Sequence, residues 1–245
     1  LAVLPRGNER IEPYIRSLYH TICPHFGATI EAQAFIWDRQ SMKPVSRLLD
    51  CPHCHNPGEY PTTPADQENA TRHSAKGLHW FRALERVAPI NDPDRQHAQD
   101  AMAAYLPRSV DALFTLINRL DQFPPARQRL LAALLLPVFD QASTLWSYPP
   151  THVRPRHLTQ PAKFQELNIW HAMEETIDKW GSLFRHRSRD DWQVPLTRFP
   201  NLVSTGGITV YEGRLRDLAT ILRYPETEAL LQRLDLKAVD RKSVV

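Results

Sequence analysis

The chain has 245 residues, of which 42% are hydrophobic and 23% charged, so it is long enough for one large domain or two small ones and too apolar for a disordered protein. The apolar run over 130–138 falls well short of the roughly 20 residues that cross a bilayer, so we expect no membrane partner. The formal net charge of +3 is compatible with nucleic acid binding. Three cysteines, two of them in a C-x-x-C pair, favour a reducing compartment, and we expect the cytoplasm.

The first third of the sequence predicts a helix followed by a β-hairpin. Asn8 is a suitable cap for a helix over 9–19. Residues 28–37 alternate between apolar and polar side chains, which is the period of a half-buried strand, and 45–49 form the returning strand. The stretch over 56–64 is rich in proline, glycine and threonine, so we expect a linker and a domain boundary there.

The rest of the sequence is mainly helical in pattern. Leucines cover most of the circumference of a helix that begins at Pro125, which predicts a central core helix with a kink near Pro137. Ser109 is a plausible cap for the helix before it. The expected elements are helices over 64–73, 78–87, 110–120, from 125 onward and over 161–185, then a strand over 208–211 and a helix over 213–222.

The cysteines predict a metal site. Cys51 and Cys54 form a C-x-x-C turn that places two thiolates together, and Cys23 begins a similar turn on the other side of the hairpin. Two such turns hold zinc with four thiolates, but Phe26 stands where the fourth cysteine is expected. The arrangement predicts a zinc-ribbon-like module that is one ligand short.

The fourth ligand is left open by the sequence. His25 is the nearest donor and would give a three-Cys, one-His zinc site, although it lies two residues after Cys23 instead of three. More distant imidazoles are those of His20, His53 and His55. The alternative is a ribbon without metal, in which Phe26 packs into the vacated space and the cysteines remain reduced thiols.

Two groups of arginines are candidate nucleic-acid-binding residues. Arg154 and Arg156 lie in a proline-rich loop, and Arg185 and Arg187 lie at the end of the helix expected over 161–185. A helix of that length spans nearly 40 Å at about 1.5 Å per residue, so the two groups would contact separate stretches of a DNA backbone. The alternative is a solvated surface for the first group and a helix-dipole cap for the second.

No catalytic residues are expected in this chain. The sequence has no Walker-type phosphate loop, no nucleophile elbow and no H-E-x-x-H zinc motif. Its histidines outside the cysteine region are scattered singly.

The linear order of several segments resembles the middle of a bacterial DNA methylase family. These segments are 14–19, 23–24, 34–39, 51–54, 77–79, 83–89, 112–117, 154–156, 168–170 and 206–208. The resemblance covers residues 10 to about 222 and implies a parent enzyme that transfers a methyl group from S-adenosylmethionine to an exocyclic amino group of a DNA base. In that family the cofactor-binding glycine loop precedes the ribbon and the catalytic Asp-Pro-Pro or Asn-Pro-Pro motif follows the final strand. The resemblance therefore implies a non-catalytic target-handling part that works with DNA and with the N- and C-terminal parts of the same polypeptide.

These expectations define an α+β fold. The expected parts are a helix and ribbon-like module over 1–62, a helical region over 63–200, and a strand and helix over 201–239 at the edge of a Rossmann-like methyltransferase sheet. The tail over 240–245 resembles a translated sequencing adapter. Two other functions stay open, which are a stand-alone zinc-ribbon and helical module that binds nucleic acid or protein, and a relative of the methylases that has lost activity.

Overall fold

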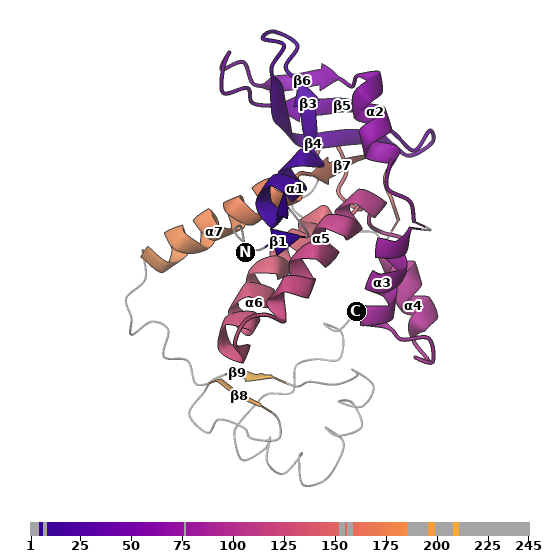
Figure 1. Ribbon diagram of the computed structural model, residues 1–245, viewed down its shortest axis with the longest axis vertical. Coiled ribbons are helices and arrows are strands. Elements are labelled where there is room, and N and C mark those ends of the chain that lie inside the picture. Colours follow the sequence, from indigo (N-terminus) through magenta and orange to yellow (C-terminus); the bar gives the residue numbers. More distant parts are fainter. Residues whose placement is uncertain are drawn as a thin grey trace. The chain divides into compact units, whose positions relative to one another are not determined.

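The computed structural model describes residues 5–6, 9–75, 77–151, 155, 159–185, 196–198 and 208–210. The chain divides into two compact units, Leu1–Ser182 and Leu183–Val245. The first unit is an α+β structure, as expected, and its helices and antiparallel sheet are drawn in Figure 1.

The sheet of the first unit has five antiparallel strands with β4 at its centre. Its strands are β3 (His20–Ile22), β4 (Thr29–Asp38), β5 (Lys43–Leu49), β6 (Gly58–Pro61) and β7 (Lys163–Leu167). Along one edge β4 pairs with β3 near its start and with β7 over its second half, and along the other edge it pairs with β5. The strand expected over 28–37 is confirmed. Its alternation holds over the first half, but residues 34–37 are all buried because β4 is covered on both faces there.

The stretch that we expected to be a linker belongs to the sheet. β6 pairs with β5 through Gly58–Pro61, so the proline-rich sequence is an edge strand, where a missing N–H is tolerated. The helix after it, α2 (Pro64–Thr71), begins as expected, with Thr63 and Asp66 forming a capping box. The first unit therefore runs through the expected boundary near residue 62.

Asp66 also ties α2 to the sheet. Its carboxylate accepts from the Thr21 hydroxyl at 2.6 Å and forms a 2.6 Å ion pair with Arg47, and all three side chains are buried. A buried ion pair needs such additional hydrogen bonds, because each charge has lost its water. These contacts fix β3 and β5, the strands that lead into the two cysteine turns.

The helices follow most of the expected pattern. They are α1 (Ile11–Ser17), α3 (Leu78–Val87), α4 (Arg95–Met102), α5 (Pro107–Leu120), α6 (Pro125–Ala142) and α7 (Ile169–Arg185). The bounds of α3 are confirmed, whereas α1 begins two residues late because residues 9–10 form β2 and pair with β1 (Pro5–Arg6). The expected cap Ser109 lies buried inside α5, which begins at Pro107, where proline has no N–H to leave unpaired.

The expectation that α6 is a central core helix is wrong. Only Leu135, Val138 and Ala142 of this helix are buried, while Leu130 and Leu136 are more than half exposed. Its mixed leucine pattern reflects a helix that packs with one narrow face, mainly against α5 and β7.

The helix expected over 161–185 is partly wrong. Residues 163–167 form β7, in which Phe164 and Glu166 are buried, and α7 begins only at Ile169. Asn168 separates the two elements, because its side chain accepts from the Trp170 N–H at 3.0 Å and donates to the Ala32 carbonyl at 3.1 Å. The 17 residues of α7 span about 26 Å rather than nearly 40 Å.

A buried ion pair joins β7 to α5 and β4. Arg108 and Glu166 are each about 1% exposed, and the Arg108 Nε donates to Glu166 at 2.9 Å. The Trp37 indole N–H donates to the same carboxylate at 2.7 Å, and Arg108 also donates to the Leu18 carbonyl at 2.8 Å. The pair and its two partners thus join four segments of the chain.

The second unit contributes one described strand pair. β8 (Leu196–Arg198) pairs in parallel with β9 (Ile208–Val210), so the strand expected over 208–211 is confirmed. The helix expected over 213–222 and the tail over 240–245 lie outside the described residues. In the part of the chain that is described, we find no helix with the length and apolar character needed to cross a membrane.

Candidate metal centre

The cysteines lie on two turns of similar backbone structure. Both turns begin with Cys-Pro-His. The Gly27 N–H donates to the Cys23 carbonyl, and the His55 N–H donates to the Cys51 carbonyl, each at 2.9 Å. The fifth residue of each turn has a positive φ, +70° at Gly27 and +50° at His55. Phe26 and Cys54 therefore hold corresponding positions, which agrees with the spacing argument from the sequence.

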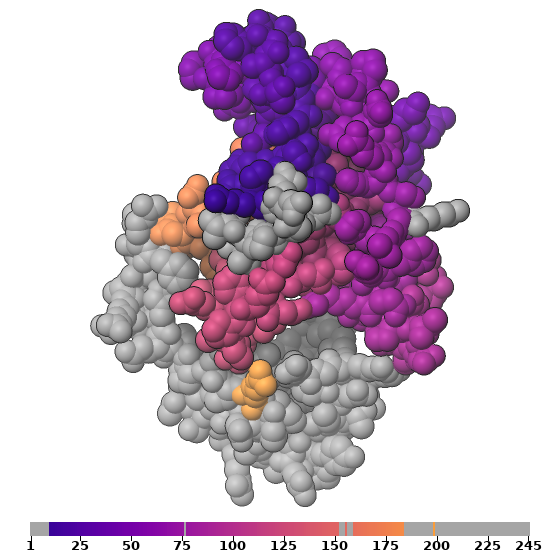
Figure 2. All heavy atoms as spheres, viewed as in Figure 1, coloured from indigo at the N-terminus to yellow at the C-terminus, as the bar shows by residue number. Residues whose placement is uncertain are grey.

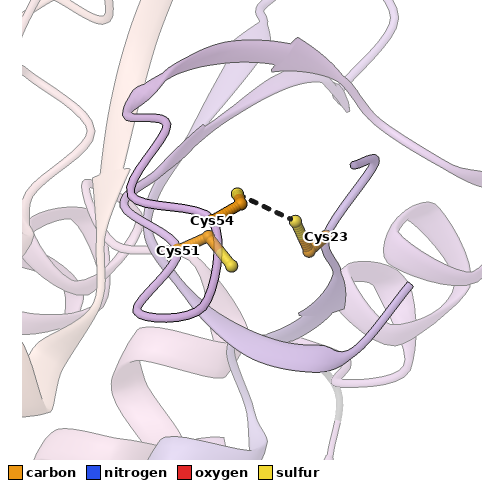
Figure 3. Close-up of side chains that lie close together, drawn as sticks. All are labelled: Cys23, Cys51 and Cys54. Atoms are coloured by element: carbon orange, nitrogen blue, oxygen red, sulfur yellow. Dashed lines mark hydrogen bonds between the residues drawn. The ribbon is translucent and has the colours of Figure 1, made fainter. Parts of the chain in front are cut away.

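The two turns bring the three sulfurs together. Cys51 and Cys54 lie on one loop and face Cys23 from the other, as Figure 3 shows. The sulfurs of Cys23 and Cys54 are 3.7 Å apart, and all three sulfurs lie within 4.8 Å of one another. Cys23 and Cys51 are buried and Cys54 is half-buried. The predicted clustering of the cysteines is confirmed. In the space-filling view, indigo and purple atoms from the first third of the chain make up the upper end of the picture (Figure 2).

The spacing of the sulfurs fits a zinc ion. Tetrahedral zinc binds thiolates at about 2.3 Å, which sets the sulfur-to-sulfur distance at about 3.8 Å. The Cys23–Cys54 distance already has this value, and the 4.8 Å bound on the others leaves at most about 1 Å to close on binding. Three soft thiolates in a half-buried cluster are a donor set that suits zinc better than magnesium or calcium.

The surroundings favour ionisation of Cys23. Burial opposes it, but the backbone N–H groups of His25 and Phe26 and the thiols of Cys51 and Cys54 together lower the pKa of Cys23. The Phe26 N–H lies 3.4 Å from the Cys23 sulfur. Burial and the neighbouring thiols instead raise the pKa of Cys54, because one negative charge disfavours a second beside it. A bound cation would remove that conflict.

His25 lies outside the group of sulfurs. Its Nε2 is 3.1 Å from the Tyr60 hydroxyl and 3.1 Å from the Asn56 amide, and its ring packs edge-on against Tyr60. The sequence made His25 the nearest candidate for the fourth ligand, whereas in the structure the metal-ligand group consists of the three cysteines alone among the described residues.

In the alternative without metal, Phe26 was to fill the vacated space, and the structure does not show this packing. Phe26 is 61% exposed, and its ring stacks on that of His53 with centroids 4.9 Å apart. The phenyl ring thus packs on the neighbouring turn instead of between the sulfurs.

The arginine candidates are not placed by the structure. Arg154, Arg156 and Arg187 lie outside the described residues, and Arg185 is described only as the last residue of α7.

Two further features had no clear signal in the sequence. A cleft of about 800 Å³ lies between α6, β7 and α7, with Trp146, Gln165 and Glu175 in its wall. Asp111, which is buried, accepts from the Tyr14 hydroxyl and lies 3.1 Å from the His79 Nδ1. Neither could be read from spacing, because each combines residues far apart in the chain.

Comparison with known proteins gave no match to a protein-family model, a curated protein or a solved structure.

Proposed function

We propose that Cys23, Cys51 and Cys54 hold a structural zinc ion that joins the two turns at the end of the sheet. The observation that carries this proposal is the meeting of three sulfurs on two turns of corresponding structure. Such an ion contributes folding free energy directly, because the unfolded chain has no preformed site. In this chain the ion would fix the relative orientation of the strands β3, β5 and β6, which adjoin the two turns.

We further propose that this zinc-ribbon-like module belongs to the non-catalytic, target-handling part of a DNA methyltransferase. The support is the order of the resembling segments in the sequence. The parallel pair β8 and β9 is the pairing expected at the edge of a Rossmann-like sheet. S-adenosylmethionine would bind the parts of the enzyme that carry the cofactor loop and the catalytic motif, and the parent would methylate an exocyclic amino group of a base.

The test of this role uses the 245-residue chain and its arginines. We expect the chain to bind duplex DNA and the double variant Arg154→Ala, Arg156→Ala to bind it more weakly, to the same extent for all DNA sequences. The slope of log affinity against log salt concentration should become smaller by about one unit for each phosphate that is no longer neutralised. The matched control changes Arg127 and Arg129, which are exposed at the start of α6, to Ala. An equal weakening in both double variants would show general charge attraction and contradict the assignment.

The cofactor provides a second test. We expect calorimetry to show no saturable binding of S-adenosylmethionine to this chain. Binding at micromolar concentration would contradict the proposal that the chain lies outside the catalytic parts of the enzyme.

The second candidate function is a stand-alone zinc-containing module that binds nucleic acid or protein. The observation that favours it is that the cysteine turns, the sheet and α2 all belong to one compact unit. Sequencing the gene on both sides separates the two, because only the methylase proposal requires a cofactor loop upstream and an Asp-Pro-Pro or Asn-Pro-Pro motif downstream.

A further inference from the structure

We propose that the zinc ion in this centre keeps one coordination position for a ligand from outside the chain. This inference rests on the proposed zinc centre and extends it. The resting ligand is water, and it exchanges for a neutral nitrogen donor such as an imidazole from a partner or from solution.

The first step is the position of the missing ligand. Since the turn of Cys23 and the turn of Cys51 share their backbone hydrogen bond and their positive φ, the residue that corresponds to Cys54 is Phe26. A thiolate at that position would complete the tetrahedron. Phenylalanine has no donor atom, and its ring lies outward on His53.

The second step concerns the other donors nearby. His25 and His53 occupy the same place in the two turns, directly after the proline, and neither joins the sulfurs. His25 contacts Tyr60 and Asn56, and His53 stacks on Phe26. Among the described residues, the group of possible metal ligands contains only the three cysteines. Zinc with three protein ligands completes its coordination with water or a substrate atom.

The third step is the chemistry of the ligand. Three thiolates and one Zn²⁺ ion have a net charge of −1, so an anionic fourth ligand would add a second negative charge. A neutral donor avoids this cost, and imidazole nitrogen is a common zinc ligand. Cys54 is half-buried while Cys23 and Cys51 are buried, so Cys54 is the most exposed residue of the three, and an outside ligand would approach on its side.

The experiment follows cobalt in place of zinc, because tetrahedral Co²⁺ bound to thiolates absorbs visible light and reports its ligands. The purified 245-residue chain is loaded with one equivalent of Co²⁺ without oxygen and titrated with imidazole. We expect thiolate-to-cobalt absorption and a saturable change of the visible bands on adding imidazole. The Phe26→Cys chain should show the bands of four thiolates, no response to imidazole, and zinc binding tighter by at least about tenfold in competition with a chromophoric chelator.

Two control variants make the result specific. Phe26→Ala removes the phenyl ring without adding a donor, so it should keep the wild-type response to imidazole. His25→Ala should keep it as well. If the wild-type chain does not respond and His25→Ala does, then His25 is the fourth ligand and the inference is overturned.

The result also separates the inference from the zinc centre itself. An absence of thiolate-to-cobalt absorption in wild-type chain and Phe26→Cys chain would contradict the metal centre. Normal absorption without any response to imidazole in wild-type chain and in both control variants would contradict only the open position. Phe26 is largely exposed, so its substitutions leave the core intact.

Discussion

Replacement of Glu166 by Ala should destabilise the first unit strongly, because it leaves the Arg108 guanidinium buried without its counter-ion. Arg108 would retain one backbone acceptor, the Leu18 carbonyl, and the faces of Tyr19 and Phe35, whose centroids lie 4.8 and 4.9 Å from its Cζ. Burial alone would lower the pKa of Arg108, but Glu166 outweighs that effect and raises it, so the charge depends on this partner.

The expected cost follows from the burial of the pair. Removing one partner of a buried ion pair costs about 3–5 kcal/mol, which is a large part of the roughly 5–15 kcal/mol that stabilises a typical domain. With a urea dependence of about 2 kcal/mol per M, the midpoint of unfolding should fall by about 1.5–2.5 M. Urea titration followed by circular dichroism measures this shift.

The matched control is the exposed ion pair between Arg86 and Asp121. This pair has the same kind of two-point contact, with distances of 2.8 and 2.9 Å, but both side chains are at least 40% exposed. Asp121→Ala should therefore shift the urea midpoint far less, because water screens an exposed pair. Replacing Arg108 and Glu166 together by Met should restore most of the stability, because no charge is then left unpaired. Equal shifts for Glu166→Ala and Asp121→Ala would refute the reasoning.

Three smaller predictions concern single residues. Burial lowers the pKa of His73, against the attraction of Asp111, so the folded protein favours the neutral imidazole. The free energy of unfolding should therefore fall as the pH drops from about 6.5 to the folded-state pKa, because the unfolded chain binds the proton more readily. His73→Gln should remove this contribution in urea titrations at several pH values. Asn168→Ala removes the side-chain acceptor of the Trp170 N–H, and thermal unfolding should show a loss of about 1–2 kcal/mol, whereas no loss would contradict the capping role. His55 has a left-handed backbone conformation, so His55→Gly should increase the free energy of unfolding by up to about 1 kcal/mol and raise the melting temperature. A lower melting temperature would show that the imidazole itself stabilises the turn.

The parts of the fold that could be predicted depend on local patterns. Residues 28–34 alternate strictly enough to identify β4, and Thr63 before Pro64 carries the signature of the α2 capping box. The cysteine cluster could be predicted because ligand spacing on a turn is itself local.

The parts that could not be predicted depend on contacts between distant residues. β7 has five residues and pairs with β4, which lies more than 120 residues earlier in the chain. Without knowledge of that partner, its sequence fits a first turn of the following helix as well as it fits a strand. The outward position of Phe26 depends on the ring of His53 from the other turn, which the sequence does not place beside it. The partners of Arg108 likewise come from segments that meet only in the folded chain.

The measurement that tests the central claim most directly is the zinc content of the chain purified without oxygen from zinc-replete medium. We predict about one zinc ion per wild-type chain, little or none in Cys51→Ser, and wild-type content in His25→Ala. A wild-type chain that is folded, has three titratable thiols and contains no zinc would contradict the metal centre.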